Sequence, residues 1–123
     1  MRLLLDTHIL LWWVANDPRL ASDHRQLIAD PSNHVFVSSV SIAEISIMVS
    51  IGKLEAPTEV AEVVLGSGFE LLAFDAAHAE ELRTMSWHHR DPFDRMLVAQ
   101  ARVEDLVLVS IDERIRLYDV ECL

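Results

Sequence analysis

The sequence predicts an α/β protein in which helices cover both faces of a mostly parallel sheet, a three-layer α/β/α architecture. Two short runs, RLLLD at residues 2–6 and LVLVS at residues 106–110, are apolar up to a polar last residue. Such runs are typical of strands buried on both faces, as in a parallel sheet covered by helices. Between them, segments with helical spacing alternate with short apolar segments, and no repeat or linker interrupts the chain. We therefore expect a single domain over residues 1–123.

The other elements follow from the same alternation. Further strands are expected at residues 34–38 and 69–74, with an edge strand at residues 120–123. Helices are expected over residues 7–15, 22–29, 39–52, 57–65 and 76–86, then from Pro92 onward, with a short helix over residues 113–118. Turn residues support the breaks, since Asp17-Pro18 follows the first helix, Asp30-Pro31 follows the second and Gly52 ends the third.

The charge and cysteine content of the chain limit the classes of function that it could have. The 123 residues carry a formal net charge of −10 and only one lysine, Lys53. This balance is unfavourable for binding nucleic acid, because phosphate contacts need lysine and arginine, unless metal ions and local arginine clusters offset it. The single cysteine, Cys122, excludes an internal disulfide. No segment is long enough to span a membrane and no clear signal-peptide cleavage site follows the apolar start, so we expect a cytoplasmic protein.

The segment HHRDPFDRMLVAQA, residues 88–101, places an acid where a core residue is expected. In a helix that begins at Pro92, Asp94 heads the apolar face formed by Leu97, Val98 and Ala101. A carboxylate pointing toward the core is costly unless a cation meets it. The alternative is structural, because Asp91 fits an N-cap and Asp94 at the third helical position would favour the helix dipole. We assign Asp91 to capping and Asp94 to function.

Glu44 repeats this geometry. It precedes Ile47, Met48 and Ile51 by three, four and seven positions on the predicted helix over residues 39–52. The alternative is again specific, since Ser41-Ile42-Ala43-Glu44 also fits a capping box. The same helix is apolar around most of its girth, so we expect part of it to form a subunit or partner surface.

Four acids are expected to converge at one edge of the sheet. Asp6 and Asp112 follow the two buried strands, while Glu44 and Asp94 lie near helix starts, although Asp112 also fits an ordinary N-cap. The carboxyl ends of parallel strands share an edge, where sites form. Converging carboxylates repel unless a cation is present, and all-oxygen ligands suit Mg²⁺ or Mn²⁺. Metal held there would activate water against a phosphodiester. Thr7 is expected to support a ligand carboxylate.

Other chemistries fit poorly. The chain has no nucleophile elbow, no Walker A loop, no dinucleotide glycine fingerprint and no zinc-spaced histidine pair. A receiver-type phosphoacceptor would need two adjacent acids after the first strand, and a haloacid-type phosphatase would need an acid where His8 stands. A non-catalytic binding module and a DNA-flap nuclease stay open as alternatives, the latter without the extra helices that clamp a duplex. His89, Arg90 and Arg95 are candidates for contacting RNA phosphates, although His88-His89-Arg90 also fits a solvated loop.

Four segments in order, LLLDTHILLWW, SVSIAEISI, HHRDPFDRMLVAQA and LVSID, resemble PIN-domain proteins, and most of all VapC-type ribonuclease toxins of toxin–antitoxin pairs. The resemblance runs from Arg2 to about Asp119, and the DPFDR segment with its preceding HH is its most specific part. It implies a PIN-like fold, cleavage of RNA with Mg²⁺ or Mn²⁺, a homodimer and inhibition by a cognate antitoxin. Asp6, Glu44, Asp94 and Asp112 take the positions of the family's metal-binding acids. One departure is that Ile47 and Met48 stand where many members are more basic.

Overall fold

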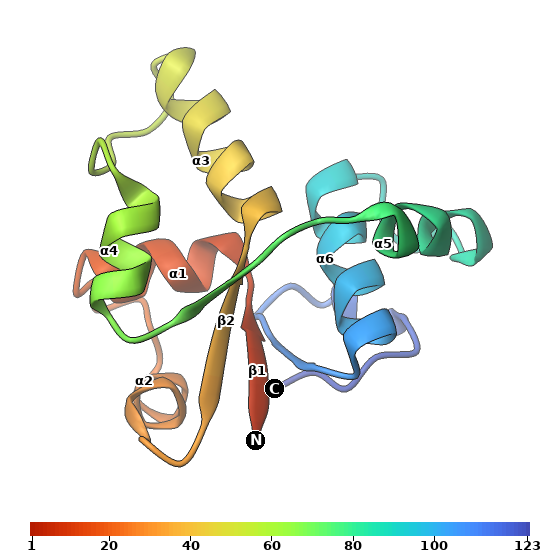
Figure 1. Ribbon diagram of the computed structural model, residues 1–123, viewed down its shortest axis with the longest axis horizontal. Coiled ribbons are helices and arrows are strands. Elements are labelled where there is room, and N and C mark those ends of the chain that lie inside the picture. The colour runs from red at the N-terminus through yellow and green to blue at the C-terminus, as the bar shows by residue number, and fades with distance from the viewer.

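A four-stranded sheet runs through the centre of the protein, whose computed structural model describes residues 1–123 (Figure 1). All strand pairs are parallel, in the order β3-β2-β1-β4. The strands are β1 (Arg2–Leu5), β2 (His34–Ser38), β3 (Glu70–Leu72) and β4 (Val107–Val109). The first strand of the chain is therefore central, and the last one lies beside it at one edge.

Helices cover both faces of the sheet, which confirms the three-layer prediction. They are α1 (Thr7–Val14), α2 (Ser22–Ala29), α3 (Ser39–Ser50), α4 (Val60–Gly66), α5 (Ala76–Glu81) and α6 (Pro92–Glu104). Figure 1 shows α1, α2 and α4 on one side of the strands and α5 and α6 on the other. None of these helices is long and apolar enough to cross a membrane.

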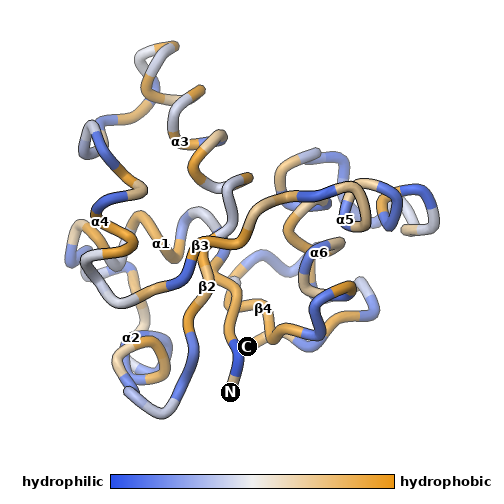
Figure 2. Tube along the Cα trace, viewed as in Figure 1, coloured by the Kyte–Doolittle hydropathy of each residue, from blue (hydrophilic) through white to orange (hydrophobic).

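Alternate residues of β1 supply two separate cores. Leu3 and Leu5 pack with Ile9, Leu10 and residues of α2 and α4, whereas Leu4 packs with Leu97 and others from α6. The alternation follows from the two-residue period of a strand, so an unbroken apolar run serves both faces. Figure 2 shows apolar residues along α1 and through the centre of the sheet, with hydrophilic residues gathered in the connecting loops.

Several predicted helices are shorter than expected, and α1 and α3 end at Val14 and Ser50 instead of at residues 15 and 52. α4 begins only at Val60, and Leu54 and Ala56 in the preceding segment pack against the first core. The helix after Asp75 changes to a 3₁₀ turn, η1 (Leu82–Thr84), before residue 86.

The predicted helix over residues 113–118 is a single 3₁₀ turn, η2 (Ile115–Leu117). This geometry puts residues three apart on one side, and Ile115 and Tyr118 are both buried. The predicted edge strand is reduced to one parallel bridge between Leu108 and Cys122. It is held by the Leu108 N–H, which donates to the Glu121 carbonyl at 2.8 Å.

Candidate active site

Three of the four predicted acids line one cavity of about 520 Å³. Asp6 directly follows β1, Asp112 comes three residues after β4, and Asp94 lies in the first turn of α6. β1 and β4 are neighbouring parallel strands, so their carboxyl ends and the start of α6 meet at one edge of the sheet. The other lining residues are His8, Trp12, Arg19, His89, Asp91, Ile111 and Arg114.

Asp6 is the most deeply buried acid of this cavity. Its side chain accepts a hydrogen bond from Ser110 Oγ at 2.6 Å through Oδ2, while Oδ1 is buried without any partner. The residue is only 4% exposed, and burial raises the pKa of its carboxyl above the usual value. A buried carboxylate oxygen without a donor is costly, so this position favours either a proton or a bound cation.

Ser110 is a site residue that sequence reasoning did not select. Besides donating to Asp6, its hydroxyl accepts the Asp112 backbone N–H at 3.0 Å. One buried side chain thus fixes the acids that follow β1 and β4 relative to each other. The only sequence signal is a serine at the end of a buried strand two residues before an acid, which is a weak pattern on its own.

The start of α6 is capped as predicted. Asp91 is the N-cap and accepts hydrogen bonds from the backbone N–H groups of Phe93 and Asp94, with Pro92 in the first turn. This cap leaves the Asp94 side chain free to point into the cavity. Burial, followed by the negative charges of Asp6 and Asp91, raises the pKa of Asp94 to about 7.

His89 lies between two of the acids, which the sequence did not reveal. Its Nε2 is 2.8 Å from Asp94 Oδ2 and 3.2 Å from Asp112 Oδ2. The Asp91 N–H donates to Nδ1 at 3.4 Å, so Nδ1 is an acceptor and the Nε2–H faces the carboxylates. The residue is buried, rather than part of a solvated loop, and it supplies an internal hydrogen-bond donor to the acids.

Asp112 differs from the other acids in its pKa. Burial is the largest influence and raises it, but the Arg114 backbone N–H at 2.9 Å, the His89 imidazole and the Arg114 guanidinium together outweigh burial. The pKa of Asp112 therefore lies below its usual value. The N-cap interpretation holds in part, because one oxygen closes a turn as a cap would. The other oxygen faces His89.

Glu44 lines an adjoining hollow of about 360 Å³, which shares His8, Trp12 and Arg19 with the acid-lined cavity. Its Oε1 is buried without a partner. Burial raises the pKa of Glu44; the nearby Thr7 hydroxyl opposes this, and the charges of Asp91 and Asp6 add to it. The fourth acid is thus electrostatically coupled to Asp6 and to the N-cap Asp91.

The capping-box interpretation of Glu44 is wrong. α3 begins at Ser39, and the N-cap is Ser38, whose side chain accepts the Val40 N–H. Glu44 therefore lies in the second turn, where no orphan N–H group needs it. Thr7 Oγ1 donates to Ser41 Oγ at 2.9 Å, which ties the start of α1 to α3.

Arg95, a candidate for contacting RNA phosphates, is buried. Arg95 is 5% exposed, and its Nη1 donates to the Ser86 carbonyl at 2.9 Å and the Tyr118 hydroxyl at 2.8 Å. The side chain is a structural tie beneath the loop that precedes α6, and it does not lie on a polar surface. Arg90, the third candidate for RNA contact, is exposed.

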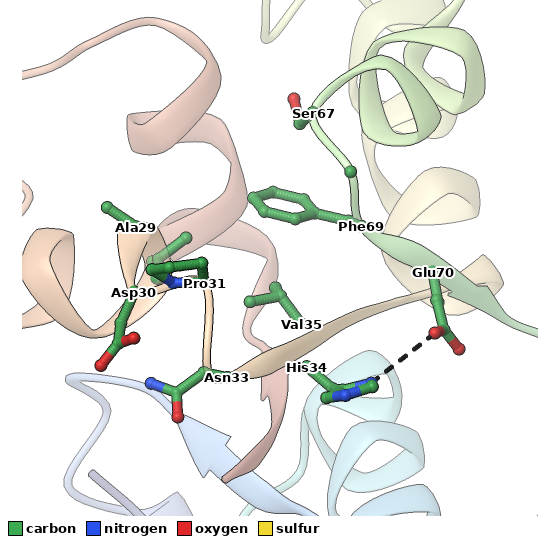
Figure 3. Close-up of a pocket in the computed structure, with 11 residues that line it drawn as sticks. Ala29, Asp30, Pro31, Asn33, His34, Val35, Ser67, Phe69 and Glu70 are labelled. Carbon is green, nitrogen blue, oxygen red and sulfur yellow. Dashed lines mark ion pairs between the residues drawn. The ribbon is translucent and has the colours of Figure 1, made fainter.

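A further hollow, of about 430 Å³, lies at the amino ends of β2 and β3 (Figure 3). Its ionisable side chains do not converge. His34 and Glu70, both exposed, form a long ion pair at 3.9 Å, and Asp30 points elsewhere (Figure 3). The acid-lined cavity at the opposite strand ends is therefore the better candidate for chemistry.

The donor set of the acid-lined cavity fits a divalent cation. Two buried carboxylate oxygens, on Asp6 and Glu44, have no hydrogen-bond partner. Ligand atoms of His89, Asp94 and Asp112 lie within 4.8 Å of one another. A set dominated by carboxylate oxygen suits hard cations such as Mg²⁺ or Mn²⁺ better than softer metals.

We expect the stability of the metal-free protein to fall as the pH rises. The pKa of Asp94, about 7 in the folded protein, exceeds its usual 3.8. The resulting stabilisation is fully present below about pH 4 and is lost as the pH rises through about 7. A divalent cation competes with the proton, so it should raise the melting temperature more at about pH 8 than at about pH 5.5.

Thermal denaturation with Mg²⁺, Mn²⁺ or EDTA at the two pH values tests this expectation. The Asp94→Asn variant, which cannot titrate at this position, should show a flatter pH dependence. Equal stabilisation by metal at both pH values would contradict the inference that Asp94 is protonated near neutral pH when no metal is bound.

Comparison with known proteins identifies the family of this chain. Residues 3–121 match the PIN domain model. The VapBC2 complex of Rickettsia felis, solved bound to a DNA fragment from its promoter, matches with a TM-score of 0.75 and 18% identity over 100% of this chain and 98% of that chain. DNA-bound VapBC of Salmonella typhimurium gives a TM-score of 0.71 and 20% identity, covering 100% and 97%.

A third solved structure, FitAcB of Neisseria gonorrhoeae, gives a TM-score of 0.67 and 20% identity, covering 98% of this chain and 96% of that chain. A comparison with curated protein sequences found no match. The structural likenesses establish the fold, and the family model spans nearly the entire chain. The protein belongs to the PIN domain family.

Proposed function

We propose that the protein is a metal-dependent endoribonuclease and the toxin of a type II toxin–antitoxin pair. The PIN family assignment implies nuclease activity. The observation that carries the proposal is the convergence of Asp6, Asp94 and Asp112 at one sheet edge, with buried, unpartnered oxygens on Asp6 and Glu44. An acidic pocket of this kind would repel a phosphodiester by itself, so bound cations must offset its charge.

The partner assignment rests on the solved relatives. The complexes from Rickettsia felis and Salmonella typhimurium contain VapBC, and those from Haemophilus influenzae and Mycobacterium tuberculosis are further VapBC complexes. We infer that this protein also pairs with an antitoxin and forms a homodimer. Exposed apolar residues on α3 (Ile47 and Val49) and at its C-cap (Ile51) support a protein contact at that helix.

In this mechanism four acids are the metal ligands, and neighbouring residues orient them. Asp6, Glu44 and Asp94 would bind the principal Mg²⁺ or Mn²⁺, and Asp112 would complete that site or support a second ion. When bound, such an ion supplies an activated water and stabilises charge on the phosphate oxygens. Ser110 fixes the Asp6 carboxylate, and Asp91 fixes the start of α6 so that Asp94 faces the cavity.

The deciding experiment compares the wild type with Asp94→Asn on total RNA, in the presence of Mg²⁺, Mn²⁺ or EDTA. A copurifying partner must first be stripped, because a bound inhibitor would imitate inactivity. We expect discrete metal-dependent fragments with the wild type, none with EDTA and none with the variant. If neither protein cleaves and calorimetry detects no metal uptake, the acids are structural and a non-catalytic binding role replaces this proposal.

A further inference from the structure

The loop between η1 and α6 displays one aromatic ring to solvent. Met85 and His89 are buried and anchor the two ends of this loop, while Trp87 between them is 76% exposed. No other large hydrophobic side chain of the protein is as exposed. A tryptophan usually buries most of its ring, so its display on an anchored loop requires an explanation.

Arg95 holds this ring from beneath. Its guanidinium carbon lies 3.8 Å from the centroid of the Trp87 ring. The same guanidinium donates to the carbonyl of Ser86 at 2.9 Å and the hydroxyl of Tyr118 at 2.8 Å, so hydrogen bonds fix its plane. These oxygens are uncharged, which leaves the cation free to interact with the ring. One face of Trp87 is thus supported, and the rest of the ring remains available.

The loop that carries the ring reaches the acid-lined cavity at His89, which lines it. Trp87 is two residues from His89, and two residues span at most about 7 Å of chain. The His89 ring contacts both Asp94 and Asp112. Arg95 links the two places as well, because it is adjacent to Asp94 in α6. A strand of nucleic acid with one phosphate at the acids would bring neighbouring bases to the loop.

The surroundings of Trp87 fit a nucleobase better than a protein surface. Its neighbours in the chain, Ser86, His88 and Arg90, are polar and exposed, so the loop itself forms no apolar patch around the ring. Protein interfaces need such a patch at their centre, whereas a single-stranded nucleic acid needs a flat ring beside cationic side chains. Arg83 and Arg90 supply exposed positive charge on both sides in an otherwise acidic protein.

We propose that Trp87, supported by Arg95, stacks an unpaired base of the RNA next to the phosphate that is cut. This inference rests on the proposed nuclease function and adds a binding residue outside the acid-lined cavity. Stacking is tolerant of base identity because every base has an aromatic face. Trp87 therefore favours unpaired RNA over duplex, in which the bases are already stacked on one another.

The test measures binding of a short single-stranded RNA by the full chain in an Asp94→Asn background, which is expected to leave the RNA uncut. Removing the ring with Trp87→Ala should weaken binding about 5-fold to 150-fold, the range that corresponds to a single base–aromatic stack. Trp87→Phe should retain most of the affinity. Leu117→Ala is the matched control, since Leu117 is also an exposed apolar residue, at 61%, and should bind like the parent.

RNA oligomers that lack one base at successive positions locate the stack. One such omission should weaken binding to the Trp87 protein as much as Trp87→Ala does, and should cost nothing further in Trp87→Ala. The melting temperature of each variant is measured to check that the variant is folded. If the wild type cleaves RNA but Trp87→Ala binds and cleaves equally well, this inference alone is overturned. Unchanged RNA binding with lost self-association would assign the ring to a second copy instead. If the wild type neither binds nor cleaves RNA, the proposed function fails first.

Discussion

Asp6→Asn should abolish metal-dependent cleavage without weakening the fold. The asparagine keeps the shape and an oxygen that can accept from Ser110, but it removes the charge on which cation binding depends. Loss of a ligand that contributes several kcal/mol of charge stabilisation corresponds to a fall in cleavage of at least about 100-fold. The free energy of unfolding of the metal-free protein should stay unchanged or rise, because a buried, poorly compensated carboxylate is gone.

The measurement combines RNA cleavage rates with urea denaturation in EDTA. Asp119→Asn is the matched control, since Asp119 is an exposed acid that does not line the cavity, and it should leave both quantities unchanged. Full cleavage by Asp6→Asn would remove Asp6 from the site. A large loss of stability would instead show that the charge of Asp6 has a structural role.

Arg95→Ala should destabilise the protein, a result opposite to that of Asp6→Asn. The change removes hydrogen bonds from a charged donor to Ser86 and Tyr118, and it leaves a void under Trp87. Hydrogen bonds to charged groups and lost core packing together cost about 2–4 kcal/mol. Arg90→Ala, on an exposed neighbour in the same segment, should change the free energy of unfolding by less than about 0.5 kcal/mol.

Urea denaturation in EDTA separates these variants. Arg95→Lys should recover little of the loss, because an ammonium lacks the planar group that stacks on the ring and donates in two directions. The result would contradict a structural role if Arg95→Ala unfolded like the wild type yet bound RNA more weakly. That outcome would return Arg95 to the RNA-contacting surface on which its sequence position first placed it.

The sequence was sufficient to predict the strands of the sheet and the places of Asp6 and Asp112 at their ends, because both depend on short patterns. Unbroken apolar runs identify β1 and β4, and parallel strands must end at a common edge, so Asp6 and Asp112 could be placed near each other. The N-cap of α6 was equally local, since Asp91-Pro92 is a recognised helix start. Each of these features can be predicted from the sequence of a single strand or helix.

Contacts between distant segments were not predictable in this way. Arg95 was a candidate for contacting RNA because a helix period cannot show that the preceding loop folds over it. His89 was left between a phosphate contact and a solvated loop for the same reason, although the fold places its ring between Asp94 and Asp112. Glu44 had two fits to its helix start, and only the position of Ser38 decides between them. Each case depends on which distant segments of the chain pack against each other.

The central position of β1 has a consequence for the synthesis of the protein. β1 pairs with β4, and Leu3 lies opposite Val107, so the sheet lacks its edge strand β4 until residues 107–109 have emerged from the ribosome. Ser110, which fixes Asp6, and Asp112 arrive at the same late stage. A nascent chain therefore carries no assembled acidic pocket until Ser110 and Asp112 have been synthesised and have reached Asp6.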